Sequence, residues 1–420
     1  MTLLSRLALA FVIAAWSTAL PDPVAADEGD IVVRTSRVLD GRGAVLEDRD
    51  IVVRGGEIVD IVSRGSASGG RVYDLTALTV LPGYIDTHVH ITHHFDPNGK
   101  FDGTEDRDVG HVTLYAVENA YRTLMSGVTT VQSLGRDDDA HLKEWIARGV
   151  IPGPRVLTSL GAIRANTGSP AEIREFVRAK KAAGADVIKI FASTSIRLGG
   201  VTNMTAEQLS AACGEARTLG LRTVVHAHRP DGIQLAADAG CSQIEHGWLA
   251  DRAALEVIAK SGMYLGNQID LLFRNYAEHG ERFDGVGSYT MEGLANLQEA
   301  QPGALKVFQE SLEAPGLKIV YNTDANAGAH GRNAEELVAY VEQGGQRPMD
   351  TVIAATSRAA ESLGLGDRIG AIATGMEADI IALDGDPMAD AAALGRVVFV
   401  MRAGTVFRNE PGSGDKMISR

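Results

Sequence analysis

The chain has 420 residues, of which 45% are hydrophobic and 22% are charged, so it can bury a large core and lacks the composition of a disordered chain. Its formal net charge of -14 argues against nucleic acid or an anionic membrane surface as the main partner, because both attract an excess of Lys and Arg. The 2 cysteines, Cys213 and Cys241, are too few to staple a chain of this size, so we expect stability to come from the core.

The first 26 residues have the pattern of a secretory signal, with Arg6 followed by an apolar run over residues 7–20. That run is shorter than the about 20 residues that span a bilayer, and the small residues 24–26 fit the rule for signal cleavage. We therefore expect cleavage after Ala26 and a secreted or periplasmic protein without a stable membrane anchor. An uncleaved anchor is the alternative.

Both ends of the mature chain are predicted to form strands. Alternating segments between about Asp30 and Val80 are separated by Gly-rich turns, and the same pattern returns after residue 367. We expect the two ends to meet in one small β-sandwich domain. The predicted divisions are a signal peptide at 1–26, a composite β-domain at 27–80 and 371–420, and a barrel at 81–370.

The middle of the chain has an α/β pattern in which apolar strands alternate with helical stretches eight times. This pattern predicts a parallel (β/α)8 TIM barrel. Helices such as those expected at 169–184 and 205–220 open with Ser or Thr and close near Gly, as capped helices do. An insertion at 270–300 follows the seventh strand and is expected to cover the site. The predicted strands are 81–91, 128–134, 155–161, 186–193, 222–228, 241–247, 263–269 and 318–325.

Polar side chains fall near the C-terminal ends of these strands, which share one mouth in a parallel barrel. His88 and His90 are two residues apart on one strand, so both project to the same side and can bind one cation. An HxH pair by itself also fits ordinary strand polarity, so the interpretation depends on the whole set. The set is His88, His90, Lys189, His226, His246 and Asp324.

The segments that carry this set resemble the amidohydrolase superfamily. The resemblance lies in the runs LPGYIDTHVH, VIKIF, VVHAH, QIEHG, NTDA and GMEADIIALDGDP. Within the superfamily, the chain is most similar to the imidazolonepropionase-like and Xaa-Pro-dipeptidase-like branch of binuclear metal-dependent amidases and peptidases, which includes enzymes that hydrolyse ochratoxin. The ordered match covers almost the whole mature chain and implies a mechanism more strongly than a substrate.

The resemblance implies two divalent metal ions. Lys189 would bridge them as a carbamate, since a protonated ammonium has no lone pair and burial beside cations lowers a lysine pKa. An ordinary salt bridge of Lys189 is the alternative. Imidazole and carboxylate ligands favour zinc, while manganese, cobalt and nickel stay open. The first ion would be bound by His88, His90 and Asp324, and the second by His226 and His246.

Two such ions about 3.5 to 4 Å apart activate a bridging water, so the resemblance implies amide cleavage by a metal-bridging hydroxide. Asp324 would take the proton of the water and pass it to the leaving nitrogen, or serve only as a ligand. His228 would polarise the carbonyl or bind a carboxylate. Arg197 suits bidentate carboxylate recognition unless it lies in a solvated loop, and His330, in a run like the branch's HG motif, is expected to contact metal or substrate.

Other positions are interpreted as secondary. His93 and His94 could extend the mouth or lie in a loop, and the loop is favoured. Two positions depart from the family pattern: Asn322 replaces the usual Gly before Thr-Asp, and Gln132-Ser133 replaces Arg-Asp. Neither change removes a metal ligand, and both are expected to reshape the pocket.

The sequence therefore predicts a hydrolase of carbon-nitrogen bonds. The expected partner is a small molecule with an amide and a carboxylate, such as a dipeptide or an N-acyl amino acid; ochratoxin-like amides and a homo-oligomeric state stay open. A single-metal deaminase or cyclic-imide hydrolase of the same fold is the enzymatic alternative, disfavoured by Lys189 and by HAHRPDG, which lacks the deaminase glutamate. A non-catalytic binding scaffold is the second alternative, disfavoured because all six ligands are present.

Overall fold

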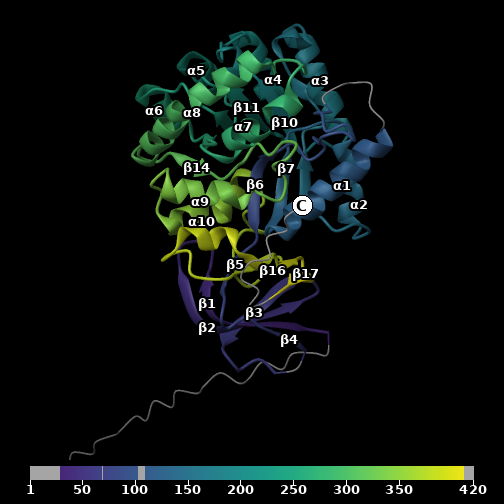
Figure 1. The fold of residues 1–420 in the computed structure, drawn as a ribbon, viewed down its shortest axis with the longest axis vertical. Helices are drawn as coiled ribbons and strands as arrows, with labels where there is room; N and C mark the ends of the chain where they lie inside the picture. Colours follow the sequence, from purple (N-terminus) through teal and green to yellow (C-terminus); the bar gives the residue numbers. More distant parts are fainter. Residues whose placement is uncertain (1–28, 69, 103–108, 411–420) are drawn as a thin grey trace, which may run out of the picture.

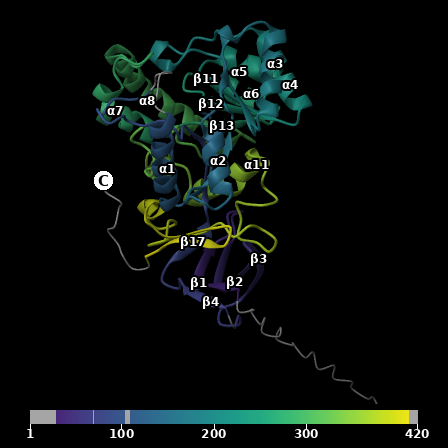
Figure 2. The same ribbon diagram turned by 90° about the vertical axis from the view of Figure 1, so that its right-hand side faces the viewer.

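The computed structural model describes residues 29–68, 70–102 and 109–410, and the predicted signal peptide lies outside these ranges. Figures 1 and 2 show an upper part in which helices surround parallel strands, and a lower part formed by a sheet to which the early and late strands both contribute. The candidate site belongs to the upper part.

Strands from both ends of the chain form one eight-stranded sheet, in the order β17-β16-β15-β5-β1-β2-β3 with β4 beside β1. The predicted meeting of the two ends is confirmed. All of these strands are joined in one hydrogen-bonded sheet. The strands are β1 (Ile31–Leu39), β2 (Val45–Arg54), β3 (Glu57–Ser63), β4 (Arg71–Asp74), β5 (Thr79–Pro82), β15 (Ile380–Leu383), β16 (Val397–Arg402) and β17 (Thr405–Asn409).

The middle of the chain forms two parallel sheets. All eight strands predicted there are present, and the short β9 is an addition. The first sheet contains β6 (Tyr84–Val89), β7 (Val128–Ser133) and β8 (Arg155–Thr158). The second contains β9 (Ala162–Ile163), β10 (Val187–Phe191), β11 (Arg222–Ala227), β12 (Gln243–His246), β13 (Tyr264–Gly266) and β14 (Lys318–Val320).

Backbone hydrogen bonds link the two parallel sheets on both sides. Thr87 N, in β6, donates to the carbonyl oxygen of Tyr321 just after β14, at 3.2 Å, and Asp186 N donates to Thr158 O at the end of β8, at 2.9 Å. Every residue of β6 and of β7 is buried, as expected of strands covered on both faces. Buried polar side chains in such strands therefore require a specific role.

Helices cover the outside of the parallel strands (Figure 1). The predicted N-caps Ser169 and Thr205 each accept a hydrogen bond from a backbone N–H three residues later, which confirms both helix starts. No helix in the described ranges is long and apolar enough to cross a membrane. The helices are α1 (Val109–Met125), α2 (Asp139–Ala147), α3 (Pro170–Ala182), α4 (Ala206–Thr218), α5 (Pro230–Asp238), α6 (Arg252–Ser261), α7 (Leu271–Phe283), α8 (Met291–Leu312), α9 (Ala334–Glu342), α10 (Pro348–Ala355) and α11 (Ser357–Ser362), with short 3-10 turns η1 (Ala165–Thr167), η2 (Ile196–Leu198) and η3 (Ala391–Gly395).

We call the eight-stranded sheet the terminal sheet. Gly83 connects its strand β5 directly to β6, the first parallel strand. Its N–H donates to Asp379 O at 2.9 Å, and a Cβ at this position would lie 2.2 Å from Thr129 Oγ1. Only glycine fits there without moving β7. Consequently β6, which carries His88, continues without a loop from β5, a strand of the terminal sheet that pairs with both β1 and β15.

A disulfide joins Cys213 in α4 to Cys241 just before β12, with a Cα–Cα distance of 5.2 Å. The two residues are buried, and their pairing was not predicted. The bond ties a helix to a strand that carries a candidate ligand. Disulfides of this kind persist in oxidising compartments.

Candidate functional site

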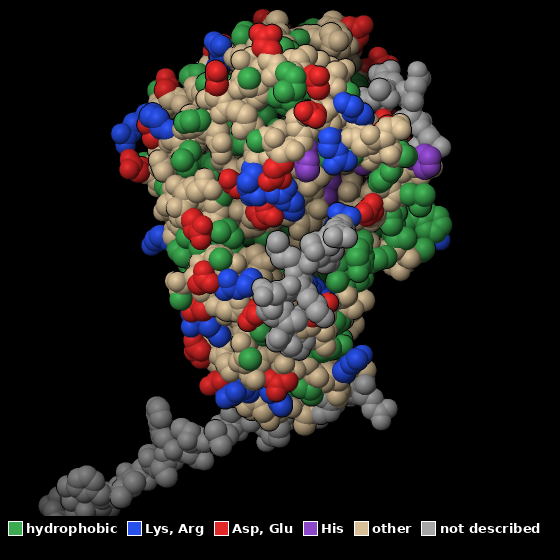
Figure 3. Space-filling model, in the orientation of Figure 1, with side chains coloured by type: hydrophobic (Ala, Val, Ile, Leu, Met, Phe, Trp, Pro, Cys, Tyr) green, Lys and Arg blue, Asp and Glu red, His purple; other side chains and the backbone are tan. Residues whose placement is uncertain are grey.

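A cavity of about 970 Å³ opens at the C-terminal ends of the parallel strands. Figure 3 shows a hollow in the upper half of one face, where histidine side chains are visible beside Lys or Arg side chains. The predicted insertion covers part of it, since residues 286–289 and side chains of α7 and α8 belong to its wall. The cavity is lined by all six predicted ligands and by two predicted substrate contacts: His88, His90, Lys189, His226, His246 and Asp324, with Arg197 and His228.

His88, His90 and Asp324 offer ligand atoms that all lie within 4.8 Å of one another. Asp324 Oδ1 is 3.0 Å from His90 Nε2 and 3.3 Å from His88 Nε2. Burial tends to raise the pKa of Asp324, but His88, His90 and His246 outweigh it and hold that pKa well below its ordinary value. An ionised carboxylate between two imidazoles is a donor set that suits a divalent cation.

Two of the predicted ligands have a backbone conformation that side chains rarely adopt. The φ angle is 51° at Asp324 and 72° at His246. Such left-handed residues cost of order 1–3 kcal/mol each and persist where the surrounding structure holds them, often at active sites. Asp324 N donates to His88 O at 2.8 Å, which holds the turn against β6.

Glu245, which sequence reasoning missed, orients His88. Its fully buried carboxylate lies 2.7 Å from His88 Nδ1, and it also accepts hydrogen bonds from Gln243 Nε2 at 2.6 Å and from Asn322 Nδ2. Burial raises the pKa of Glu245 to about 8, and Lys189 opposes this effect. When Glu245 is ionised, its carboxylate accepts from His88 Nδ1, and His88 then presents Nε2 to the cavity. The sequence offered one sign of this role: Glu245 is an acidic residue directly before His246, in a segment expected to be a buried strand.

Lys189 projects from β10 and is buried, with its Nζ 3.5 Å from His88 Nε2. Burial lowers the pKa of Lys189 to about 8; Glu245 and Asp324 oppose this effect, and Arg164 adds to it. A neutral amine is therefore accessible near neutral pH, as carbamylation requires.

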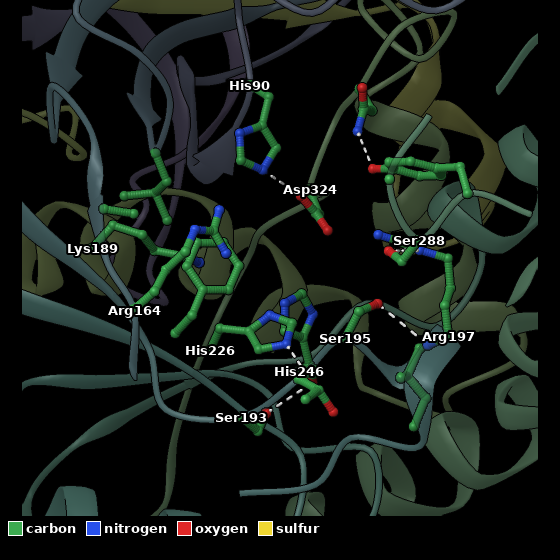
Figure 4. A pocket seen from close by; sticks show the side chains of 18 of the residues that line it. His90, Arg164, Lys189, Ser193, Ser195, Arg197, His226, His246, Ser288 and Asp324 are labelled. Atoms are coloured by element: carbon green, nitrogen blue, oxygen red, sulfur yellow. Dashed lines mark hydrogen bonds and ion pairs between the residues drawn. The ribbon is translucent and has the colours of Figure 1, made fainter. Parts of the chain in front are cut away.

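His226 and His246 form a second group, with ring centroids 4.5 Å apart. Figure 4 shows both rings across the cavity from His90, with Asp324 between. Burial lowers the pKa of His246 to about 3 and that of His226 well below its ordinary value, so both imidazoles are neutral, the form that binds metals. His246 Nδ1 lies 2.8 Å from Gln268 Oε1, which leaves Nε2 available to the cavity.

His228 stands beside this group, with its ring 5.1 Å from that of His246. Both of its ring nitrogens are buried without a hydrogen-bond partner among the described residues. A buried imidazole in this state needs a partner that enters the cavity, such as a substrate or a water molecule.

Arg197 lies on the opposite wall of the cavity from Lys189 (Figure 4). Its guanidinium carbon is 3.8 Å from the centre of the Tyr289 ring, and its Nε donates to Ser288 Oγ at 3.1 Å. No carboxylate of the described chain pairs with it. The Arg197 side chain is thus held against the predicted insertion. It does not extend from a solvated loop, which was the alternative.

The structure also places three other histidines, and it corrects the expectation for His330. His330 does not line the cavity; its Nε2 donates to His90 O at 3.1 Å, so it supports the strand end behind the site. His93 and His94 both lie in the loop after β6, as favoured. His93 also lines the cavity and stacks on His90 with ring centroids 4.6 Å apart, whereas His94 is buried against Tyr115 away from the cavity.

The two departures from the family pattern lie beneath the cavity. Gln132 donates to Thr87 O at 2.9 Å and accepts from Arg222 Nη2 at 2.8 Å, while Asn322 donates to Glu245. Neither Gln132-Ser133 nor Asn322 lines the cavity. Their contacts are with the network that supports the cavity, so any effect on its shape is indirect.

Comparisons with known proteins agree with this geometry. The model of the amidohydrolase family matches residues 79–407. An ochratoxinase from Aspergillus niger is 27% identical, over 88% of this chain and 83% of its own length. The crystal structure of a Xaa-Pro dipeptidase with bound methionine in the active site has a TM-score of 0.81 and 27% identity, covering 91% of this chain and 100% of that one. The A. niger ochratoxinase structure shares the fold, with a TM-score of 0.78, 23% identity, and coverage of 92% and 97%.

The family match spans most of the chain and contains every predicted ligand. Members of this family generally bind divalent metal ions, and the group of His88, His90 and Asp324 has the donors for one. The chain belongs to the amidohydrolase family and is a metal-dependent hydrolase of amide bonds.

Proposed function

We propose that the enzyme cleaves the amide bond of a dipeptide or an N-acyl amino acid and releases an amino acid. The observation that carries this proposal is the position of Arg197, an arginine without a carboxylate partner in the described structure, across the cavity from Lys189 and Asp324. An amide held at Asp324 would place a carboxylate of its leaving group at this guanidinium. The names of two relatives, an ochratoxinase and a Xaa-Pro dipeptidase, support cleavage of this kind.

The residues of the cavity fit two divalent metal ions, with zinc the metal that the ligands favour. One ion would be held by His88, His90 and Asp324, the other by His226 and His246. Lys189 would bridge them after its neutral amine adds carbon dioxide to form a carbamate and releases a proton. When bound, such ions supply Lewis acidity to the scissile carbonyl and to the attacking water.

The remaining chemistry belongs to side chains of this protein. Asp324 is ionised and can accept the proton of the attacking water and return it to the leaving nitrogen. His228 can donate a hydrogen bond to the carbonyl oxygen, since neither of its ring nitrogens has a protein partner in the described chain. Arg197 holds the carboxylate, and the insertion shields the amide from bulk water.

The same proposal extends to architecture and location. The hydrogen bonds that link the two parallel sheets on both sides support one closed (β/α)8 barrel over residues 81–370, with the chain ends at 27–80 and 371–420 as a second domain. The disulfide between Cys213 and Cys241 supports export to the periplasm or outside the cell.

The test compares an N-acyl amino acid with its carboxamide analogue on protein stripped of metal and reloaded with zinc. The kcat/KM for the acid should exceed that for the carboxamide by about tenfold or more. Arg197→Met should bring the ratio of these two kcat/KM values closer to one. Arg178→Met, which removes an exposed arginine of α3 far from the cavity, is the control. Equal turnover of acid and carboxamide would remove the carboxylate proposal. Ammonia release from pyrimidines or purines would point instead to a deaminase, and inactivity of the metal-loaded protein on every amide to a scaffold.

A further inference from the structure

The cavity has a second cationic wall, opposite Arg197. It is formed by the loop after β7 and by the segment from β9 into η1, which are joined by a hydrogen bond from Gly161 N to Gly135 O at 2.9 Å. Arg136 and Arg164 both line the cavity on this wall. In Figure 4, Arg164 lies beside Lys189, and Arg197 lies on the far side of Asp324 and the histidines.

Arg164 is held in place by its surroundings. Its backbone N–H donates to Thr167 Oγ1 at 2.9 Å, and its carbonyl accepts from Thr167 N at 2.9 Å. Its guanidinium carbon lies 3.9 Å from the centre of the Phe191 ring, and Lys189 Nζ is 5.1 Å from the same ring. The ring contact places the guanidinium on the same side of the cavity as Lys189.

The donors of this guanidinium have no acceptor in the described chain. Asp137, the carboxylate on the same wall, pairs with Lys180 at 2.7 Å instead. Arg164 is an exposed residue that lines the cavity, so its donors are open to a ligand that enters there. Arg222, which is partly buried, differs because it donates to Ser362 O and to Gln132 Oε1, at 2.9 and 2.8 Å, and so is satisfied within the fold.

We propose that Arg164 binds an anionic group on the acyl half of the substrate. With Arg197 binding the carboxylate of the leaving amino acid, as the proposed function holds, the preferred substrates are amides with a carboxylate on each side of the scissile bond. An N-acyl amino acid whose acyl chain ends in a carboxylate has this form. In a chain of net charge -14, two arginines without carboxylate partners on facing walls give the cavity a local field that favours such a dianion.

The test uses two nearly isosteric compounds, an N-succinyl amino acid and its succinamoyl analogue, in which the distal carboxylate becomes a carboxamide. Zinc-loaded enzyme should cleave the succinyl compound about tenfold or more faster in kcat/KM. Arg164→Gln should bring the ratio of the two rates close to one. Arg164→Lys, which keeps the charge and loses the planar fork, should give an intermediate ratio. Arg178→Gln should leave the ratio unchanged.

The outcomes separate this inference from the proposed function. Hydrolysis of both compounds at equal rates would overturn the role of Arg164 and leave amide hydrolysis intact. A preference for the succinyl compound that survives Arg164→Gln would assign selection to another group on this wall. Failure to cleave any amide would overturn the proposed function itself. Circular dichroism of each variant confirms that it is folded, and if Arg164→Gln is not, the Lys variant carries the test.

Discussion

Glu245 decides which nitrogen of His88 faces a metal ion. A ligand histidine whose second nitrogen is bound to a carboxylate has a fixed tautomer and a fixed ring, and it is a stronger base toward the metal. Here that carboxylate is fully buried and accepts from His88, Gln243 and Asn322. Glu245 is thus a positioning residue, and its effect should appear in metal affinity.

We expect Glu245→Gln to weaken metal binding about tenfold, because a neutral amide is a poorer acceptor for His88 Nδ1. Competition with a chelator measures the affinity, and activity at saturating metal should return towards that of the wild type. Glu336→Gln is the matched control: Glu336 is equally buried, but it accepts from the backbone N–H groups of Ile269 and Leu271. If both variants lose metal to the same extent, the effect is general destabilisation and Glu245 has no special role.

Lys189→Ala should lose activity by about 100-fold, because the bridging ligand that holds the two ions is gone. Short carboxylic acids added to the variant should restore part of that activity, since a carboxylate can fill the space of the carbamate. Lys260→Ala, which removes an exposed lysine of α6 paired with Glu256, should keep the wild-type activity and gain none from the added acids. Full activity of Lys189→Ala with two metals bound would show that the bridging role is wrong.

At the scale of the elements, β13 packs closely against the segment after β14 because Gly266 of β13 has no side chain. A Cβ on Gly266 of β13 would lie 2.0 Å from Asn322 Nδ2 and 3.0 Å from Glu245 Oε2. Asn322 stands where the family pattern has glycine, so the side chain gained after β14 occupies the space left by Gly266. The two positions are therefore coupled.

Gly266→Ala should lower the free energy of unfolding by about 1–3 kcal/mol, as overpacking does. Asn322→Gly in the same chain should recover part of that loss, with a coupling energy of about 1–2 kcal/mol. Urea unfolding of the two single variants and the double variant measures the coupling. Gly214→Ala is the control, because Gly214 lies within α4 and an added Cβ meets no atom within 4 Å. Additive effects at 266 and 322 would refute the coupling.

Strands and helix starts could be predicted because their patterns repeat along the chain. Contacts between residues that are distant in sequence could not. The period of apolar residues predicted all eight strands, and the caps predicted the starts of α3 and α4. In a parallel barrel the C-terminal strand ends share one mouth, so the ligands placed at those ends were correctly predicted to line one cavity. The pairing of Cys213 with Cys241 and the contact of Glu245 with His88 depend on distances across elements. His330 was misplaced because the path of the loop after β14 is fixed by tertiary contacts that a motif does not encode.

At the scale of the whole molecule, location and redox state go together. We expect mature protein from the periplasm or medium to begin near Asp27 and to contain the Cys213–Cys241 disulfide. N-terminal sequencing identifies the first residue of the mature chain. Mass spectrometry after alkylation reports the disulfide, since two alkyl groups should be added only after reduction. Recovery of intact Met1 with two free thiols in a soluble cytoplasmic fraction would contradict the proposal.

The place of β5 in the terminal sheet has a consequence for the time at which the site forms. β5 pairs with β1 at only two positions and with β15 at four, and it continues directly into the strand that carries His88. During synthesis, β15 (Ile380–Leu383) emerges long after β5 (Thr79–Pro82). A nascent polypeptide that lacks its last strands leaves β5 with an open edge, and contacts of such long sequence separation form late. We therefore expect the strand that carries His88 to settle late in synthesis, and metal binding to follow completion of the chain.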